Sequence, residues 1–199
     1  MRADLRVQKT KQMLYRALVE LMEKYPFNEI KVVQLIRASG VSKDTFYRHY
    51  DTIYGLYREM MAEEVEKING ALYNPTQGYR NQKEYAVNHV KIMLENQKVW
   101  RVALKETSPN ILIDLLVTHF ERTAQEYYNG RPDLQYQNPV SDGNIDLFRR
   151  FGCATEVVSI QYVINHAEKT PEELAEQINE NFVAFGESAI NSDYRKVLE

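Results

Sequence analysis

The sequence predicts an all-α fold of about nine helices, and three observations lead to that prediction. Apolar residues recur three and four positions apart through successive segments of the chain. Nowhere do apolar and polar residues alternate over more than four positions, as they would in a half-buried strand. Serine, threonine, proline and glycine stand between these segments, at places where helices begin and end.

Four helices are expected at the start of the chain. The first carries apolar residues at helical spacing from Leu14 to Met22 and cannot continue through Pro26. A short second helix ends at Gly40. Ser42 can cap a third, because its hydroxyl accepts from a free N–H of the first turn. The expected helices span residues 4–24, 31–39, 43 to about 49, and 52–69.

Turn residues between positions 69 and 78 separate these helices from a second helical part. A cap followed by proline, Ser108-Pro109, opens one helix of that part. Another begins at Thr170-Pro171-Glu172-Glu173, which has the pattern of a capping box. Helices are expected over 85–93, 98–106, 108–127, 145 to about 169, and from 171 onward, with a long loop at 129–143.

Composition excludes several classes of protein. A chain of 199 residues buries enough surface to fold without a disulfide or a metal, and its one cysteine, Cys153, allows no internal disulfide. The most apolar stretch, residues 111–117, contains Asp114 and is far shorter than the ~20 residues that span a bilayer. The first residues contain no apolar run typical of a signal peptide. We therefore expect a cytoplasmic protein with no membrane partner.

Charge is distributed unevenly along the chain. Residues 1–60 contain eleven Lys and Arg against seven Asp and Glu, an excess of four positive charges. The remainder contains 14 Lys and Arg against 21 Asp and Glu, an excess of seven negative charges. The net charge of −3 therefore combines a basic N-terminal part, called the basic front here, with an acidic remainder. Such a front can face a polyanion while the whole chain stays in solution.

Residues 35–50 carry the most informative pattern. Two short helices meet at Gly40, a residue that accepts the left-handed backbone of a tight turn. Val41 is expected to point inward, and Ser42 to cap the second helix. That helix is short and rich in donors, as is the helix of a helix-turn-helix that enters the major groove of DNA. An ordinary helical corner with a solvated face explains the turn alone equally well.

Residues 5–60 resemble the N-terminal domain of the TetR (tetracycline-repressor) family of transcriptional regulators. The resemblance runs through the first helix, the Gly40 turn and the run Val41-Ser42-Lys43-Asp44-Thr45-Phe46-Tyr47-Arg48-His49-Tyr50. It implies a helix-turn-helix domain over 1–52 and a helical effector-binding and dimerisation domain over 53–199. Residues 149–178 also resemble regulators of the dihydroxyacetone-kinase-activator type.

The resemblance implies which residues contact DNA. Base or phosphate contacts fall on Lys31, Ser42, Lys43, Asp44, Thr45, Tyr47, Arg48 and His49, with further phosphate contacts from Lys9 and Lys11. Phe46 and Tyr50 lie on the opposite face and are expected in the core. The sequence departs from the family pattern at Asp44, which repels phosphate, at Ile53, where a lysine is frequent, and at Lys31, where threonine is usual.

The resemblance also implies a homodimer and a small-molecule effector bound by the helical body. Candidate effector contacts are Tyr85, His89, Met93, Trp100, Phe120 and Cys153. Candidate dimer contacts are Phe151, Gly152, Thr155, Val158, Tyr162, Ile178, Phe182 and Phe185. Each of these residues could instead belong to the ordinary core of the subunit.

No pattern in the sequence indicates an enzyme or a cofactor. The four histidines and one cysteine form no metal-ligand spacing, and no phosphate-binding or dinucleotide motif occurs. The function expected is that of a repressor that binds a pseudo-palindromic double-stranded DNA operator as a homodimer and is released by an effector. The alternative is a helical dimer that has lost operator binding and acts through a protein partner.

Overall fold

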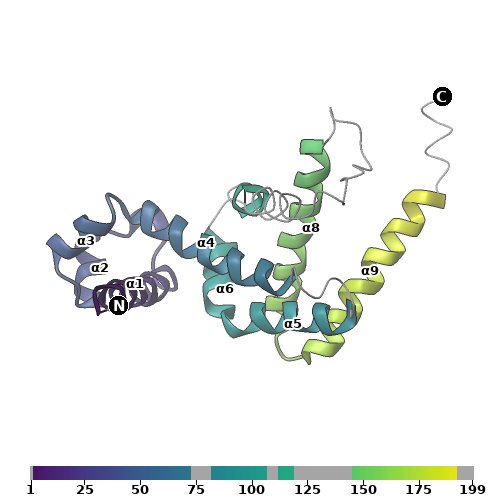
Figure 1. The fold of residues 1–199 in the computed structure, drawn as a ribbon, viewed down its shortest axis with the longest axis horizontal. Helices are drawn as coiled ribbons and strands as arrows, with labels where there is room; N and C mark the ends of the chain where they lie inside the picture. Colours follow the sequence, from purple (N-terminus) through teal and green to yellow (C-terminus); the bar gives the residue numbers. More distant parts are fainter. Residues whose placement is uncertain (1, 73–81, 107–111, 119–144, 192–199) are drawn as a thin grey trace.

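The computed structural model describes residues 2–72, 82–106, 112–118 and 145–191. Every regular element in these ranges is helical, and none of the described residues lies in a strand. The prediction of an all-α fold is therefore confirmed. With helical residues 112–118 counted, the described ranges contain nine α-helical segments, in agreement with the expected number; the elements are labelled in Figure 1.

The N-terminal end contains α1 (Arg2–Met22), a 3₁₀ turn at Phe27–Glu29, α2 (Val32–Ser39) and α3 (Lys43–His49). The sequence predicted that the first helix would reach residue 24, but α1 ends at Met22. The last turn tightens there, since the Lys24 N–H donates to the Leu21 carbonyl, three residues back, at 3.0 Å. The 3₁₀ turn that follows was not predicted.

The long helix α4 (Ile53–Leu72) leads from this end into the body, three residues longer than predicted at its C-terminus. The body contains α5 (Gln82–Glu95), α6 (Gln97–Glu106), helical residues 112–118, α8 (Ile145–Asn165) and α9 (Pro171–Asn191). The predicted loop at 129–143 lies outside the described residues, as does most of the predicted helix 108–127.

Two helix ends in the body follow local chemistry. Thr170 and Glu173 form the predicted capping box: the Thr170 N–H donates to Glu173 at 2.9 Å, and the Glu173 N–H donates to the Thr170 hydroxyl at 3.2 Å. The preceding helix, α8, was predicted to reach about residue 169 but ends at Asn165. The His166 N–H is shared between the carbonyls of Tyr162 and Val163, a tightening of the last turn that is common where a helix ends.

One hydrophobic core joins the two ends of the molecule. It begins with Leu14 and Leu18 of α1 and continues into the body to Trp100 of α6 and Leu174 of α9. Helix α4 belongs to both parts, since its buried stripe runs along its length. That stripe is Leu56, Tyr57, Met60, Met61, Val65 and Ile68.

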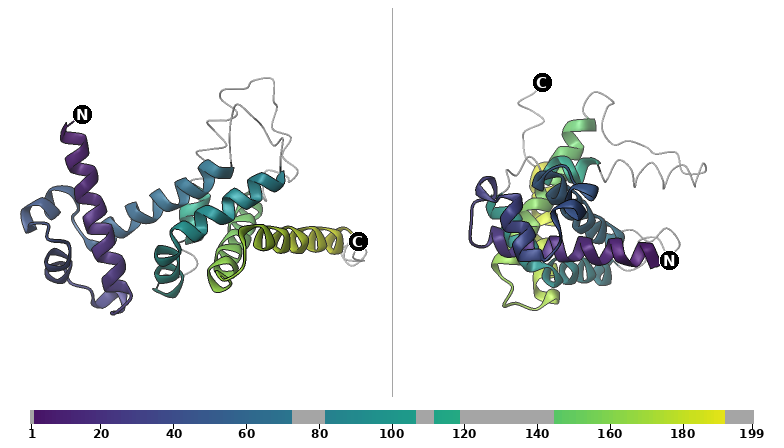
Figure 2. Two further views of the ribbon diagram at one scale, coloured as in Figure 1. Left: turned by 90° about the horizontal axis from the view of Figure 1, so that it is seen from below. Right: turned by 90° about the vertical axis from the view of Figure 1, so that its left-hand side faces the viewer.

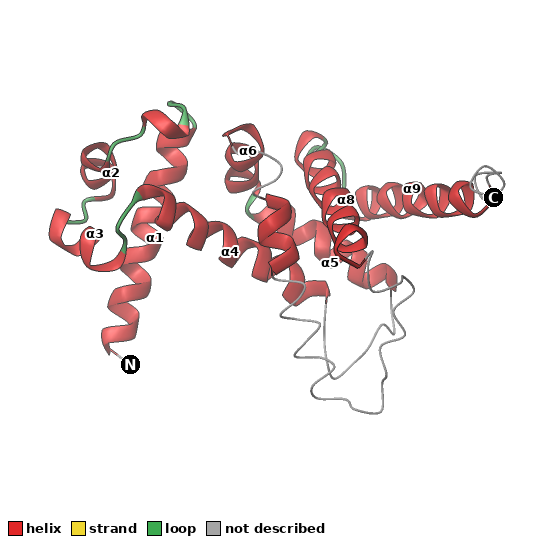
Figure 3. Ribbon diagram, turned by 90° about the horizontal axis from the view of Figure 1, so that it is seen from above, coloured by secondary structure: helices red, strands yellow, loops and turns green. Residues whose placement is uncertain are grey.

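The elements form an elongated molecule (Figure 1). Helices α1, α2 and α3 are grouped at one end, and α4 connects them to the body. Figure 2 shows α9 extending from the body away from this N-terminal group. Figure 3 shows the same arrangement from above, with α2 and α3 on the far side of α1 from the body. A surface on α3 and a surface on α9 therefore lie at opposite ends of the chain's fold.

Candidate nucleic-acid interface

The turn between α2 and α3 has the geometry that the sequence predicted. Gly40 has a φ of 70° and a ψ of 8°, the left-handed conformation, and its N–H donates to the Ile36 carbonyl at 3.0 Å. Val41 is buried, and its N–H donates to the Ser39 hydroxyl at 3.2 Å. The turn is thus fixed on both sides of Gly40, and it sets the direction in which α3 leaves α2.

Ser42 begins α3 as predicted. Its hydroxyl oxygen accepts from the Thr45 N–H at 3.2 Å and its O–H donates to the Thr45 hydroxyl at 2.8 Å. Phe46 is fully buried and Tyr50 is almost so, which confirms that this face of α3 joins the core. The Phe46 and Tyr50 rings lie 6.0 Å apart between centroids. Because one face of α3 is fixed in the core, the orientation of the other face is fixed as well.

The outward face of α3 presents hydrogen-bond donors to solvent. Lys43, Tyr47 and Arg48 are exposed, and the Lys43 ammonium lies 6.0 Å from the centre of the Tyr47 ring. The eight residues expected at DNA are at least partly accessible: Lys31, Ser42, Lys43, Asp44, Tyr47 and Arg48 are exposed, and Thr45 and His49 are half-buried. The arrangement can place an exposed helix surface with two cationic side chains against a polyanion.

Lys31 precedes α2 and leaves its ammonium exposed. The departure from threonine removes a hydroxyl that could cap the first turn, while the Gln34 side-chain oxygen accepts from the Lys31 N–H at 2.7 Å. The start of α2 therefore combines a cation with the free N–H groups of a helix N-terminus, both of which favour an anion.

Lys11 does not present a free cation to DNA. Its ammonium forms an ion pair with Glu59 of α4 and lies 3.7 Å from Glu63 one turn further on. The hydrogen bond to Glu59 raises the pKa of Lys11. A phosphate contact from Lys11, as expected from the resemblance, would have to compete with these two carboxylates. Lys9 is exposed.

Two tyrosines complete this contact between α1, α3 and α4. The Tyr15 hydroxyl donates to Glu63 at 3.0 Å, and burial together with nearby Tyr50 raises the pKa of Tyr15. Burial and the Glu59 carboxylate likewise raise the pKa of Tyr50. Burial would also raise the pKa of Glu59, but the hydrogen bond from the charged Lys11 ammonium outweighs it and holds that pKa below its ordinary value. Sequence reasoning missed these contacts, since residues 48 positions apart give no local signal.

The predicted effector residues lie mainly in the interior of the body. Met93, Trp100 and Cys153 are buried, and the Trp100 N–H has no acceptor among the described residues. His89 of α5 is paired with Glu156 of α8, with 2.8 Å between Nε2 and Oε1. Burial, with the Glu156 charge, raises the pKa of the Cys153 thiol to about 11. Phe120 and the side chain of Tyr85 lie outside the described part of the chain.

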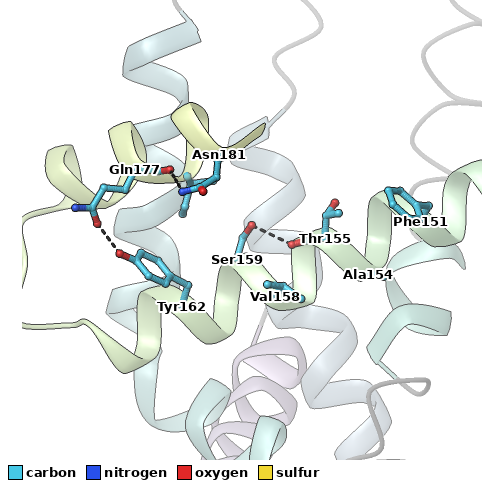
Figure 4. Close-up of a pocket in the computed structure, with 9 residues that line it drawn as sticks. Phe151, Ala154, Thr155, Val158, Ser159, Tyr162, Gln177 and Asn181 are labelled. Carbon is cyan, nitrogen blue, oxygen red and sulfur yellow. Dashed lines mark hydrogen bonds between the residues drawn. The ribbon is translucent and has the colours of Figure 1, made fainter. Parts of the chain in front are cut away.

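The predicted dimer residues on α8 border an open groove of about 520 Å³ between α8 and α9. Phe151, Thr155, Val158 and Tyr162 line it from α8, and Ile178 lines it from α9. Figure 4 shows the Tyr162 hydroxyl directed at Gln177, to which it donates at 2.6 Å. Val158 is 63% exposed and Phe151 53%, high fractions for apolar side chains that line one groove from the same helix.

The remaining predicted dimer residues are Gly152 of α8 and Phe182 and Phe185 of α9. Gly152 follows Phe151 in α8, and a Cβ there would meet no described atom within 4 Å. Phe182 and Phe185 fall within α9, but their side chains lie outside the described residues. A second groove, of about 450 Å³, separates α4 from residues 112–118 and is bordered by Arg58, Glu59 and Leu115.

The described residues hold no group of three or more His, Cys, Asp or Glu placed to bind a metal ion. Among the described helices, none has the length and hydrophobicity needed to cross a membrane.

Comparison with known proteins supports the fold. No family model and no curated protein matches the sequence. Among solved structures, the chain is similar to the crystal structure of a proposed TetR-family transcriptional regulator from Syntrophomonas wolfei str. Goettingen, with a TM-score of 0.63 and 14% identity. The match covers 92% of this chain and 95% of the other, so it includes the N-terminal helices and the body together. The matched part of the chain therefore has the same fold as that structure.

Proposed function

We propose that this protein is a transcriptional regulator that binds a pseudo-palindromic DNA operator as a homodimer, represses from it, and is released by a small-molecule effector. The observation that carries the proposal is the exposed face of α3, held by Gly40 and Ser42 in a chain that is similar over 92% of its length to the structure of a proposed TetR-family regulator. In this proposal the protein is a cytoplasmic regulator and not an enzyme.

The two functional halves are assigned as residues 1–52 for DNA and 53–199 for the effector and dimer. In a helix-turn-helix dimer, two recognition helices enter successive major grooves about 34–36 Å apart. Here α3 supplies the base-facing residues Lys43, Tyr47 and Arg48, while Lys31 and His49 contact phosphates. The basic excess of residues 1–60 favours this end of the molecule as the DNA-binding one.

The groove between α8 and α9 supports the assignment of the dimer interface. It contains the two most exposed large apolar side chains among the described residues of α8, Phe151 and Val158, which were predicted to lie at the dimer interface. A second copy related by a two-fold axis would cover these side chains and form a four-helix bundle. Burying such apolar surface stabilises the assembly by roughly 25 cal/mol per Å².

The effector site is assigned to the interior of the body around Trp100, His89, Met93 and Cys153. The Trp100 N–H, which has no acceptor among the described residues, could donate to a polar atom of a mainly apolar ligand. The His89–Glu156 pair offers a second polar group between α5 and α8. Membership of the dihydroxyacetone-kinase-activator type stays a prediction from residues 149–178 alone.

The test is a selection from random duplex DNA with the purified full chain, followed by salt titration of the winning sequence. A regulator of this kind recovers a palindrome, and its affinity falls steeply as salt rises, because each phosphate contact releases counterions. Failure of a folded dimer to enrich any sequence, with or without metabolite extracts, would overturn the proposal.

That failure would favour the alternative, a dimer that acts through a protein partner. One observation favours this alternative. Asp44 is exposed in the first turn of α3, among the predicted DNA contacts, where its carboxylate would repel phosphate. The DNA affinity of an Asp44→Ala variant distinguishes DNA binding by α3 from action through a protein partner. If α3 binds DNA, removal of the carboxylate raises non-specific affinity, since a repulsion from phosphate is lost.

A further inference from the structure

We infer that Gln177 of α9 is a positioning residue for the dimer. It joins α8, α9 and the segment between them, and so fixes the width of the groove that a second copy enters. This inference rests on the dimer proposed above and assigns the side chains that hold its interface in shape. Those side chains, Tyr162, Lys169 and Gln177, are called the Gln177 link here.

The Gln177 link connects three successive segments through one oxygen atom. The Oε1 atom of Gln177 accepts from the Tyr162 hydroxyl of α8 at 2.6 Å and from the Lys169 ammonium, which precedes α9, at 3.1 Å. The same ammonium lies 5.9 Å from the centre of the Tyr162 ring. Figure 4 shows the Tyr162 and Gln177 side chains meeting across the space between the two helices. All three side chains of the link are half-buried, so water competes less for these bonds than at the surface.

His166 restrains the Tyr162 ring. The two ring centroids lie 4.2 Å apart, and the Nδ1 atom of His166 lies 2.8 Å from the Tyr162 carbonyl oxygen. That carbonyl also accepts from the His166 N–H at 3.1 Å, so His166 is held to the last turn of α8 by its backbone and its ring. The phenol that reaches Gln177 is therefore packed against a fixed neighbour.

The link matters because α8 and α9 pack mainly on other helices. Within the described residues, α9 packs chiefly on α5, and α8 packs on α6 and α5. Figure 1 shows α8 and α9 diverging from the end at which the chain connects them. The groove of about 520 Å³ opens between them, and Tyr162 and Gln177 border it. Their hydrogen bond therefore stands where it can set the distance between the two helices.

The groove fits an apolar segment of a second copy. The hydroxyls of Thr155 and Ser159, which line it, donate to carbonyls of their own helix at 2.7 and 2.9 Å. The Tyr162 hydroxyl is used in the Gln177 link, so no hydroxyl of the lining is left to donate to a polar ligand. A two-fold interface uses the same surface on both subunits, and this surface offers the exposed side chains of Phe151 and Val158.

The experiment measures the dissociation constant of the dimer by sedimentation equilibrium, with variants of the full chain. Gln177→Met keeps the length of the side chain and removes the acceptor. We expect the dissociation constant to rise about tenfold, because two donors in each subunit lose their acceptor. If Gln177 were only part of the contact surface, the same change would tighten the dimer, since it adds apolar area to the groove.

Gln177→Glu is the rescue variant. It keeps the side-chain oxygen as an acceptor, and the Lys169 ammonium beside it balances the new charge. We expect a dissociation constant within about twofold of the parent's. A role in surface contact alone predicts the opposite, because a carboxylate without a partner is costly to bury in an interface. A Gln177→Glu dimer as weak as that of Gln177→Met would contradict the role of the acceptor.

Two further variants separate the link from its surroundings. Tyr162→Phe removes only a hydroxyl and should also weaken the dimer, so it serves as the test if Gln177→Met does not fold. Combined with Gln177→Met it should cause no further loss, because both changes break the same bond. Asn181→Leu is the matched control: Asn181 borders the groove one turn further along α9, and its side chain donates to a carbonyl of its own helix. This control should not weaken the dimer. Parent-like or tighter dimers in both Gln177→Met and Tyr162→Phe overturn the inference.

The link can be judged even if the parent chain is a monomer. Amide hydrogen exchange then reports how firmly α8 and α9 are joined. Gln177→Met should speed exchange at residues 160–166 and 174–181 and leave residues 43–49 of α3 unchanged. A monomeric parent with this result overturns the proposed dimer and supports the link between α8 and α9. Unchanged exchange in these residues overturns the link as well.

Discussion

Arg48 lies exposed in the last turn of α3, on the face opposite the buried Phe46. Arginine there can donate two hydrogen bonds to one guanine. We expect Arg48→Ala to lower operator affinity by about 1–3 kcal/mol and to relax the base preference at one position in each half-site. The measurement is a binding series over all four bases at each operator position.

The matched control for this prediction is Arg37→Ala, which removes the same exposed side chain from the last turn of α2. It should leave base preference unaltered. An Arg48→Ala variant that weakens all sequences equally would instead make Arg48 a phosphate contact.

Lys31 is expected to act on the DNA backbone only. Its exposed ammonium stands at the start of α2, where the free N–H groups of the helix also attract an anion. Lys31→Ala should weaken binding to specific and random duplexes by the same factor. It should also reduce the slope of log affinity against log salt by roughly two per dimer, about one unit for each subunit.

Lys24→Ala is the control for Lys31, because Lys24 is also exposed, beyond the end of α1, and is not predicted to contact DNA. Its salt slope should match that of the parent. A changed sequence preference in Lys31→Ala would contradict the role given to this residue.

At the scale of the element, the start of α9 provides a stability prediction. The Thr170 N–H and hydroxyl both donate to Glu173 at 2.9 Å, and these hydrogen bonds lower the pKa of Glu173 below its ordinary value of 4.5. A lowered pKa in the folded state means that the charged form is stabilised by folding. This contribution is complete above about pH 4.5 and is lost as the pH falls through the lowered pKa.

Glu173→Gln should therefore lower the urea midpoint of unfolding at neutral pH and converge on the parent in acid. Glu176→Gln is the control: it changes an exposed glutamate of the same helix and should follow the parent at every pH. A constant difference between Glu173→Gln and the parent from neutral pH to pH 2 would mean that the cap does not depend on charge.

At the scale of the whole molecule, the proposed function requires a dimer. Val158 is 63% exposed beside the groove between α8 and α9, where the second copy is proposed to pack. Val158→Asp would place a carboxylate in that interface without a partner, and burying an unpaired charge is costly. We expect the dissociation constant of the dimer to rise more than tenfold, as measured by sedimentation equilibrium.

Val33→Asp makes the same substitution at a comparably exposed valine of α2, at the other end of the molecule. It should leave the dimer intact, and circular dichroism should show both variants folded. A Val158→Asp protein that still forms a parent-like dimer would place the interface elsewhere.

Much of the fold could be predicted because its signals are local. Gly40, Ser42 and the pair Thr170 and Glu173 mark helix ends through bonds that span only a few residues. The buried stripe of α4 follows from helical spacing alone. Errors occurred where the last turn of a helix tightens: α1 stopped short of its predicted end, and so did α8.

Within the candidate site, the sequence by itself determined the turn at Gly40, the cap at Ser42 and the division of α3 into an inner and an outer face. Tertiary structure decided how the helices are joined. It paired Lys11 with Glu59, Tyr15 with Glu63 and His89 with Glu156. It also left Phe151 and Val158 exposed. The physical reason is that helical periodicity specifies which face of a helix is apolar, whereas polar contacts between helices depend on how those faces meet in space.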